Sequence, residues 1–105
     1  MDTVFLINAR FPAGNLVMTR GVADLAEQDT EFARFVQKCL IRHFKKDWGD
    51  VDEPDKKEND FSVDHNLRVL SAYNDSRWND HGVASLWIIT EADRSATTVL
   101  FPDEY

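Results

Sequence analysis

Residues 84–101, ASLWIITEADRSATTVLF, decide the fold class, because two strand-favouring runs flank a turn short enough for a hairpin. The first run spans residues 84–90, and the second spans 95–101, where Pro102 ends it. An earlier run at residues 68–73 has the same character and precedes the polar loop 74–82. Three consecutive strands with short connections predict an antiparallel β-meander.

Residues 30–44 predict the helix that covers one face of this meander. Their apolar side chains recur at intervals of three and one, the stripe of an amphipathic helix: Phe32, Phe35, Val36, Cys39, Leu40, His43 and Phe44. The opposite face carries a basic ridge, defined as Arg34, Lys38, Arg42 and Lys45. We therefore expect an α+β fold, a small antiparallel meander packed against an amphipathic helix with additional short helices.

Shorter elements complete the expected fold. Runs at residues 4–7 and 16–18 favour strands, and Thr19 is a plausible cap for a short helix that ends near residue 28. A half-exposed helix is expected from about residue 53 to residue 66, with Pro54 in its first turn. Whether the strand at residues 4–7 joins the meander stays open.

Length and composition indicate one compact domain over residues 1–105, with 43% hydrophobic and 30% charged residues. Cys39 is the only cysteine, which excludes an internal disulfide and a thiolate zinc site and favours a reducing compartment. The apolar stretch Val4–Ile7 is too short for a signal peptide, and no run approaches the ~20 apolar residues of a membrane span. We expect a cytoplasmic protein without a membrane partner.

The formal charge of -7 is concentrated in one acidic segment, residues 47–64. This segment holds eight acidic residues and two lysines, so the rest of the chain is nearly neutral. Such a balance argues against a surface built chiefly for phosphates and makes nucleic acid a disfavoured partner. It leaves open whether the acidic segment is a solvated face, pairs with the basic ridge, or imitates a phosphate backbone toward a protein partner.

We expect the binding surface to join the acidic segment, Trp48 and the hairpin turn at residues 91–95. Acids beside an arginine and hydroxyl groups suit a functional loop on a rigid sheet, although the turn acids also order hairpins. The expected surface consists of Trp48, Asp50, Asp52, Glu53, Asp55, Glu58, Tyr73, Glu91, Asp93 and Arg94.

An enzymatic alternative places a divalent metal among nearby acids and one imidazole: His43, Asp47, Asp50, Asp52 and Asp55. A bound ion there would activate water for phosphodiester hydrolysis. The spacing does not make an EF-hand loop, and His43 falls on the apolar stripe, where a core histidine is commoner. Cys39 on the same stripe suits an inert buried thiol. We therefore predict no metal and no cofactor.

The C-terminal half resembles a small bacterial family of plasmid-related proteins that has no assigned activity. The resemblance rests on Asp47-Trp48-Gly49-Asp50, Asn59, Leu70-Ser71-Ala72-Tyr73, Trp87 to Ser95, and Thr97 to Tyr105. It covers roughly residues 16–105, and the stretch from Trp87 is its specific part. Lys46 stands where family members have glycine. The resemblance implies a mobile-element protein of a plasmid or phage.

These observations favour a small, acidic, non-catalytic accessory protein that acts by contact with a protein partner. The most specific version of this hypothesis is an inhibitor of a host nucleic-acid enzyme, such as an antirestriction or anti-CRISPR factor. The competing class is a metal-dependent nuclease or toxin that uses His43, Asp47 and Asp50. A homodimer held by an open sheet edge is a third possibility.

Overall fold

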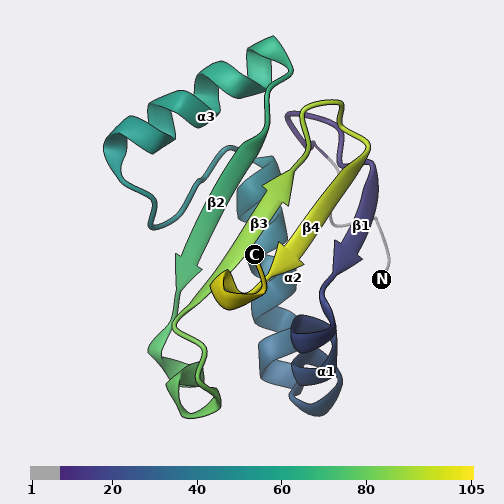
Figure 1. The fold of residues 1–105 in the computed structure, drawn as a ribbon, viewed down its shortest axis with the longest axis vertical. Helices are drawn as coiled ribbons and strands as arrows, with labels where there is room; N and C mark the ends of the chain where they lie inside the picture. Colours follow the sequence, from purple (N-terminus) through teal and green to yellow (C-terminus); the bar gives the residue numbers. More distant parts are fainter. Residues whose placement is uncertain (1–7) are drawn as a thin grey trace.

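A mixed sheet forms the centre of the computed structural model, which describes residues 8–105. Its strands are β1 (Asn15–Met18), β2 (Val69–Asn74), β3 (Ser85–Thr90) and β4 (Ala96–Leu100), in the order β1-β4-β3-β2 (Figure 1). Strands β2, β3 and β4 pair antiparallel, which confirms the expected meander. Strand β1 adds to β4 in parallel. The strand expected at residues 4–7 lies outside the described residues.

Helix α2 (Thr30–Phe44) lies behind the sheet in Figure 1, and α1 (Arg20–Gln28) packs against α2 below the end of β1. Helix α3 (Glu53–His65) runs beside β2 at the edge of the sheet. All three helices form where the sequence predicts them. Two short 3₁₀ helices, η2 (Ser76–His81) and η3 (Pro102–Glu104), complete the fold, and η2 falls in a stretch expected to be a loop. Its N-terminus is capped by Asp75, whose carboxylate accepts a bond from the Arg77 N–H at 2.9 Å.

The core forms between α2 and the rear face of the sheet. Because strand side chains alternate between faces, every second residue of β2, β3 and β4 points toward α2. The apolar stripe of α2 is buried as expected, except that Phe35 is only partly buried. The strands contribute Val69, Tyr73, Leu86, Ile88 and Val99 to this core.

A chain of polar side chains crosses the core beside these apolar residues. The Thr97 hydroxyl donates to the Ala13 carbonyl at 2.8 Å, so Thr97 must accept from the Thr90 hydroxyl at 2.7 Å. Thr90 then accepts from the Nε2–H of His43 at 2.9 Å, and the Ser71 hydroxyl donates to Nδ1 at 2.6 Å. One consistent set of donors therefore fixes His43 as the neutral Nε2–H tautomer.

The outer edge of β2 is occupied by groups from the preceding segment. The side-chain amide of Asn59 donates to the Leu70 carbonyl at 2.7 Å and accepts from the Leu70 N–H at 3.2 Å. Further along the edge, Ala72 bonds through its carbonyl to the Asp50 N–H at 2.7 Å and through its N–H to the Trp48 carbonyl at 3.3 Å. The backbone of β2 is thus paired on both sides.

None of the helices in residues 8–105 is long and apolar enough to cross a membrane.

Candidate functional site: an acidic helix and the pocket beside it

Helix α3 is formed by its caps rather than by an apolar stripe. The Asp52 carboxylate accepts from the Asp55 N–H at 3.0 Å, and Pro54 occupies the first turn. Glu53 and Asp55 place negative charge where the helix dipole favours it. The helix ends at Asn66, which takes a left-handed conformation with φ of 53°. Only Asn59 and Ser62 are buried, so most of the helix faces solvent.

The acids of α3 divide into paired and unpaired groups. Glu53 pairs with Lys56 at 3.3 Å, and Asp60 lies 3.7 Å from Lys46. Asp55, Glu58 and Asp64 form no ion pair within residues 8–105. The negative charge of neighbouring Asp52 raises the pKa of Asp55. The N-terminal half of α3, with Asp52, Glu53, Asp55 and Glu58 against Lys56 and Lys57, therefore carries a net negative charge.

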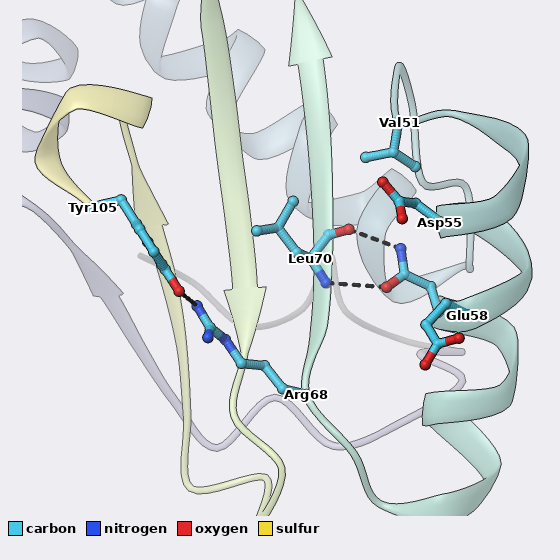
Figure 2. A pocket seen from close by; sticks show the side chains of 7 residues that line it. Val51, Asp55, Glu58, Arg68, Leu70 and Tyr105 are labelled. Atoms are coloured by element: carbon cyan, nitrogen blue, oxygen red, sulfur yellow. Dashed lines mark hydrogen bonds between the residues drawn. The ribbon is translucent and has the colours of Figure 1, made fainter.

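A pocket of about 300 Å³ opens between this half of α3 and the front face of the sheet. Asp55 and Glu58 come from the helix side. Arg68 directly precedes β2, and its side chain extends away from α3 to Tyr105, so that Leu70 lies between the two groups (Figure 2). The complete lining is Val51, Asp55, Glu58, Asn59, Arg68, Leu70 and Tyr105. Carboxylates, an apolar floor and one cation thus meet in a single concavity.

Arg68 is directed toward Tyr105 at the wall of the pocket opposite α3. Its guanidinium donates to the Tyr105 hydroxyl at 2.7 Å and lies 5.1 Å from the centre of the ring. The Tyr105 ring in turn contacts Trp87 edge-on, at 5.9 Å between ring centres. These contacts hold the cation of Arg68 away from Asp55 and Glu58, with which it forms no ion pair within the described residues.

Trp48 and Tyr73 are core residues, so the expectation that they belong to an exposed surface is wrong. Trp48 is 3% exposed, and its indole N–H donates to Asp60 at 2.9 Å. Tyr73 is 1% exposed, and its hydroxyl donates to the Asp47 carbonyl at 2.8 Å. Both large rings are buried because α2 and the segment after it close over the β2 side of the sheet.

The segment Asp47–Asp50 lies between α2 and α3 in the chain and runs along the outer edge of β2. The Asp47 carboxylate accepts from Arg42 at 2.7 Å, a bond that lowers the pKa of Asp47, so one member of the basic ridge pairs with the acidic segment. Gly49 has φ of 73°, and a Cβ there would lie 2.1 Å from the Ala72 carbonyl oxygen. Asp50 accepts from the Asn74 N–H at 2.8 Å. The Asp-Trp-Gly-Asp motif is therefore structural in this chain.

The hairpin turn lies near the C-terminal end of α3. The expectation that it forms one surface with Trp48, Asp50 and Tyr73 is therefore wrong. The Arg94 guanidinium donates to the Leu67 carbonyl at 2.7 Å and to the Ser62 carbonyl of α3 at 2.9 Å. Burial lowers the pKa of Arg94. Asp93 accepts from the Ser95 N–H at 3.0 Å, whereas the Glu91 backbone closes the turn. Arg94 and Asp93 order the hairpin and attach it to α3.

The expected surface is thereby divided between the two ends of α3. The structure brings Asp52, Glu53, Asp55 and Glu58 together at the N-terminal end. It places Glu91, Asp93 and Arg94 near the other end, where Arg94 bonds to Ser62. Asp55 and Ser62 are separated by roughly 10 Å along the helix axis. We therefore confine the candidate site to the N-terminal half of α3 and its pocket.

The alternative metal site is not assembled. His43 is fully buried and bonded to Ser71 and Thr90, whereas Asp47 and Asp50 are exposed and bonded to Arg42 and Asn74. Across residues 8–105, no three His, Cys, Asp or Glu side chains are grouped so that they hold a metal ion. Burial, with a smaller contribution from Arg94, lowers the pKa of His43 to about 3. The structure therefore does not bring His43, Asp47 and Asp50 together into one metal site.

Five lining residues of the pocket are not among the site residues expected from the sequence: Val51, Asn59, Arg68, Leu70 and Tyr105. Arg68, Leu70 and Tyr105 are the three that no sequence pattern connects to the acidic segment. They come from the strand β2, its entry and the last residue, which meet only in the folded chain. One signal was present, because alternation along β2 places Leu70 on the face opposite Val69, Ser71 and Tyr73. An apolar residue such as Leu70 on the open face of the sheet favours a binding surface there.

Comparisons of the chain with protein-family models, with curated proteins and with solved structures find no match.

Proposed function

We propose that this chain is a small acidic binding protein whose helix α3 contacts a basic surface on a protein partner. The observation that carries the proposal is the net negative charge at the N-terminal half of α3, where Asp55 and Glu58 form no ion pair within the described residues. Fixed negative charge on a rigid element attracts a positive partner and orients it. Asp52, Glu53, Asp55 and Glu58 are all exposed, although Asp55 and Glu58 lie on the same face of α3 as the buried Asn59 and Ser62.

The partner class that best fits this surface is an enzyme that binds nucleic acid. Such enzymes carry lysine- and arginine-rich surfaces that neutralise phosphates, and a row of carboxylates competes for the same groups. The resemblance to plasmid-related proteins supports a mobile-element origin, for which restriction or CRISPR enzymes are natural targets. Binding of α3 would block the access of nucleic acid to the enzyme without any catalytic step.

The test is to recover partners from a host extract and to compare two variants of equal charge. The acidic-helix variant carries Asp52→Asn, Glu53→Gln, Asp55→Asn and Glu58→Gln. Asn at position 52 retains the helix cap, so the fold is expected to persist. We expect this variant to bind the recovered partner at least ~10-fold more weakly, and we expect wild-type binding to weaken as salt is raised.

The control variant changes two Asp and two Glu residues that are exposed elsewhere: Asp24→Asn, Glu27→Gln, Asp80→Asn and Glu91→Gln. It has the same net charge as the acidic-helix variant and should bind like the wild type. Equal affinity of the acidic-helix variant and the wild type would exclude α3 as the contact. Nucleic acid added to the purified complex should compete with the wild-type protein for the partner.

A further inference from the structure

We propose that the pocket beside α3 binds one lysine or arginine side chain of the protein partner, and that this side chain anchors the contact. The inference rests on the proposed function and specifies the group that the acidic helix recognises. The arrangement that supports it is two carboxylates on one wall, an apolar floor, and an opposite wall whose cation is bonded to Tyr105.

The size of the pocket suits a single long side chain. Its volume of about 300 Å³ lies at the lower end of the ~300–1,000 Å³ that small-molecule sites occupy. Val51 and Leu70 line it with apolar surface, against which the methylene stem of lysine or arginine can pack. A stem buried on Leu70 would direct the charged end of that side chain toward α3 (Figure 2).

The charges in the pocket favour a cation at the helix wall. Asp55 and Glu58 are three residues apart on α3 and therefore lie on neighbouring turns of one face. Asp52 adds further negative charge beside Asp55 and raises its pKa, a repulsion that an incoming cation relieves. Arg68 does not supply that cation, because its guanidinium is bonded to the Tyr105 hydroxyl.

A side chain in such a pocket is expected to contribute more to binding than a charge at the rim. Anchors that fill a pocket lose water around both the stem and the charged end, whereas exposed ion pairs stay hydrated. The remaining acids of α3, including Glu53 and Asp64, would then steer the partner without fixing its position. This difference separates an anchor in the pocket from diffuse attraction.

The first experiment uses the peptides acetyl-Gly-Arg-Gly-amide and acetyl-Gly-Lys-Gly-amide, with the neutral citrulline peptide as reference. Amide shifts of the whole chain are followed up to about 10 mM peptide, since one side chain is expected to bind with a Kd on the order of 1 mM. We expect saturable shifts at Asp55 to Asn59, in the Asn59 side chain and at Leu70 for a basic peptide. Shifts that fail to saturate, or that the citrulline peptide reproduces, would overturn the proposal.

The second experiment compares two double variants of α3 with the same composition and charge. Asp55→Asn with Glu58→Gln removes the carboxylates of the pocket, whereas Glu53→Gln with Asp64→Asn removes two acids that do not line it. All four positions are exposed, so both variants should fold, which circular dichroism checks. We expect the first variant to lose at least ~10-fold in affinity for the basic peptides and for the recovered partner, and the second less than ~3-fold.

The outcomes distinguish the pocket from the acidic surface. Equal losses in the two double variants would show that the charge acts diffusely, which rejects the anchor and leaves the proposed function standing. If the two double variants and the fourfold acidic-helix variant all bind the partner as tightly as the wild type does, the proposed function and the anchor are both wrong. A loss confined to the pocket variant supports the anchor.

Discussion

At the residue scale, His43 shows how burial turns a candidate ligand into a structural group. Its ring is fully buried, with both nitrogens bonded to hydroxyl groups of the sheet. In the Nε2–H tautomer each of these bonds is satisfied, whereas protonation of Nδ1 would deprive the Ser71 hydroxyl proton of its acceptor. The folded protein therefore holds His43 neutral at pH values where an exposed histidine is charged.

We expect this histidine to make the fold sensitive to mild acid. Below the ordinary pKa of 6.5 the unfolded chain binds a proton at His43, but the folded chain does so only near pH 3. The free energy of unfolding should therefore fall by about 1.4 kcal/mol per pH unit as the pH drops below ~6.5. Urea unfolding between pH 7 and pH 5 measures this slope.

The variant His43→Gln isolates the contribution of this residue. It should be less stable than the wild type at pH 7, because Gln does not reproduce both hydroxyl bonds. Between pH 7 and pH 5, however, its stability should lack the part of the slope that His43 supplies. An identical pH slope in both proteins would mean that other groups cause the acid sensitivity.

Gly49 and Gly82 provide a matched pair for testing how closely the Asp47–Asp50 segment approaches β2. Both have φ of 73°, but a Cβ on Gly49 would meet the Ala72 carbonyl oxygen at 2.1 Å, whereas one on Gly82 meets no atom within 4 Å. We expect Gly82→Ala to lower the free energy of unfolding by about 1 kcal/mol, because alanine disfavours a left-handed backbone. Gly49→Ala should lower it by about 3 kcal/mol or more, because the added Cβ also meets the backbone of β2. Similar losses in thermal or urea unfolding would contradict the close approach.

At the element scale, the start of α1 depends on a residue from the other end of the chain. The Thr19 side chain makes no capping bond; its hydroxyl donates instead to the Glu104 carboxylate at 2.6 Å. Glu104 also accepts from the Gly21 N–H at 3.1 Å and from the Phe101 N–H at 2.9 Å. The carboxylate of η3 therefore supplies the cap that the sequence assigns to Thr19.

Replacement of Glu104 should consequently destabilise the fold although the residue is exposed. Glu104→Ala removes the three bonds and the charge at the helix N-terminus, so we expect a loss of about 1–2 kcal/mol in the free energy of unfolding. Asp103→Ala, an exposed neighbour, should change it by less than ~0.5 kcal/mol. Chemical denaturation measures the free energy of unfolding of the two variants, and equal losses would contradict the capping role of Glu104.

Sequence patterns predict the elements better than their assembly. The stripe from Phe32 to Phe44 and the strand-favouring runs report local periodicity, which burial against one neighbouring layer imposes directly. The parallel addition of β1 to β4 joins residues far apart along the chain, and the Asn59 side chain bonds to Leu70 across the connection between α3 and β2. No local pattern encodes such a pairing, so neither the covered edge nor the pocket could be predicted.

At the scale of the whole molecule, the fold divides the acidic residues into those that bond within the protein and those that face the pocket. The acidic segment 47–64 is not uniform: Asp47, Asp50 and Asp60 bond to Arg42, Asn74 and Trp48, whereas Asp55 and Glu58 face the pocket. The sequence predicts the amount of acidity but not this division, because an acid that bonds within the fold and one that faces solvent look alike. Residue type alone likewise misplaces Trp48 and Tyr73, since large aromatic rings suit both cores and interfaces.

The way α3 is attached to the sheet has a consequence for its motion. Polar bonds dominate the attachment, from Asn59, Asp60 and the Arg94 guanidinium, whereas α2 buries a full apolar stripe. Water can replace such bonds at little cost, but it cannot replace apolar contacts. We therefore expect α3 to open locally while the core stays intact, and we expect a partner seated on α3 to slow that opening, which amide hydrogen exchange measures.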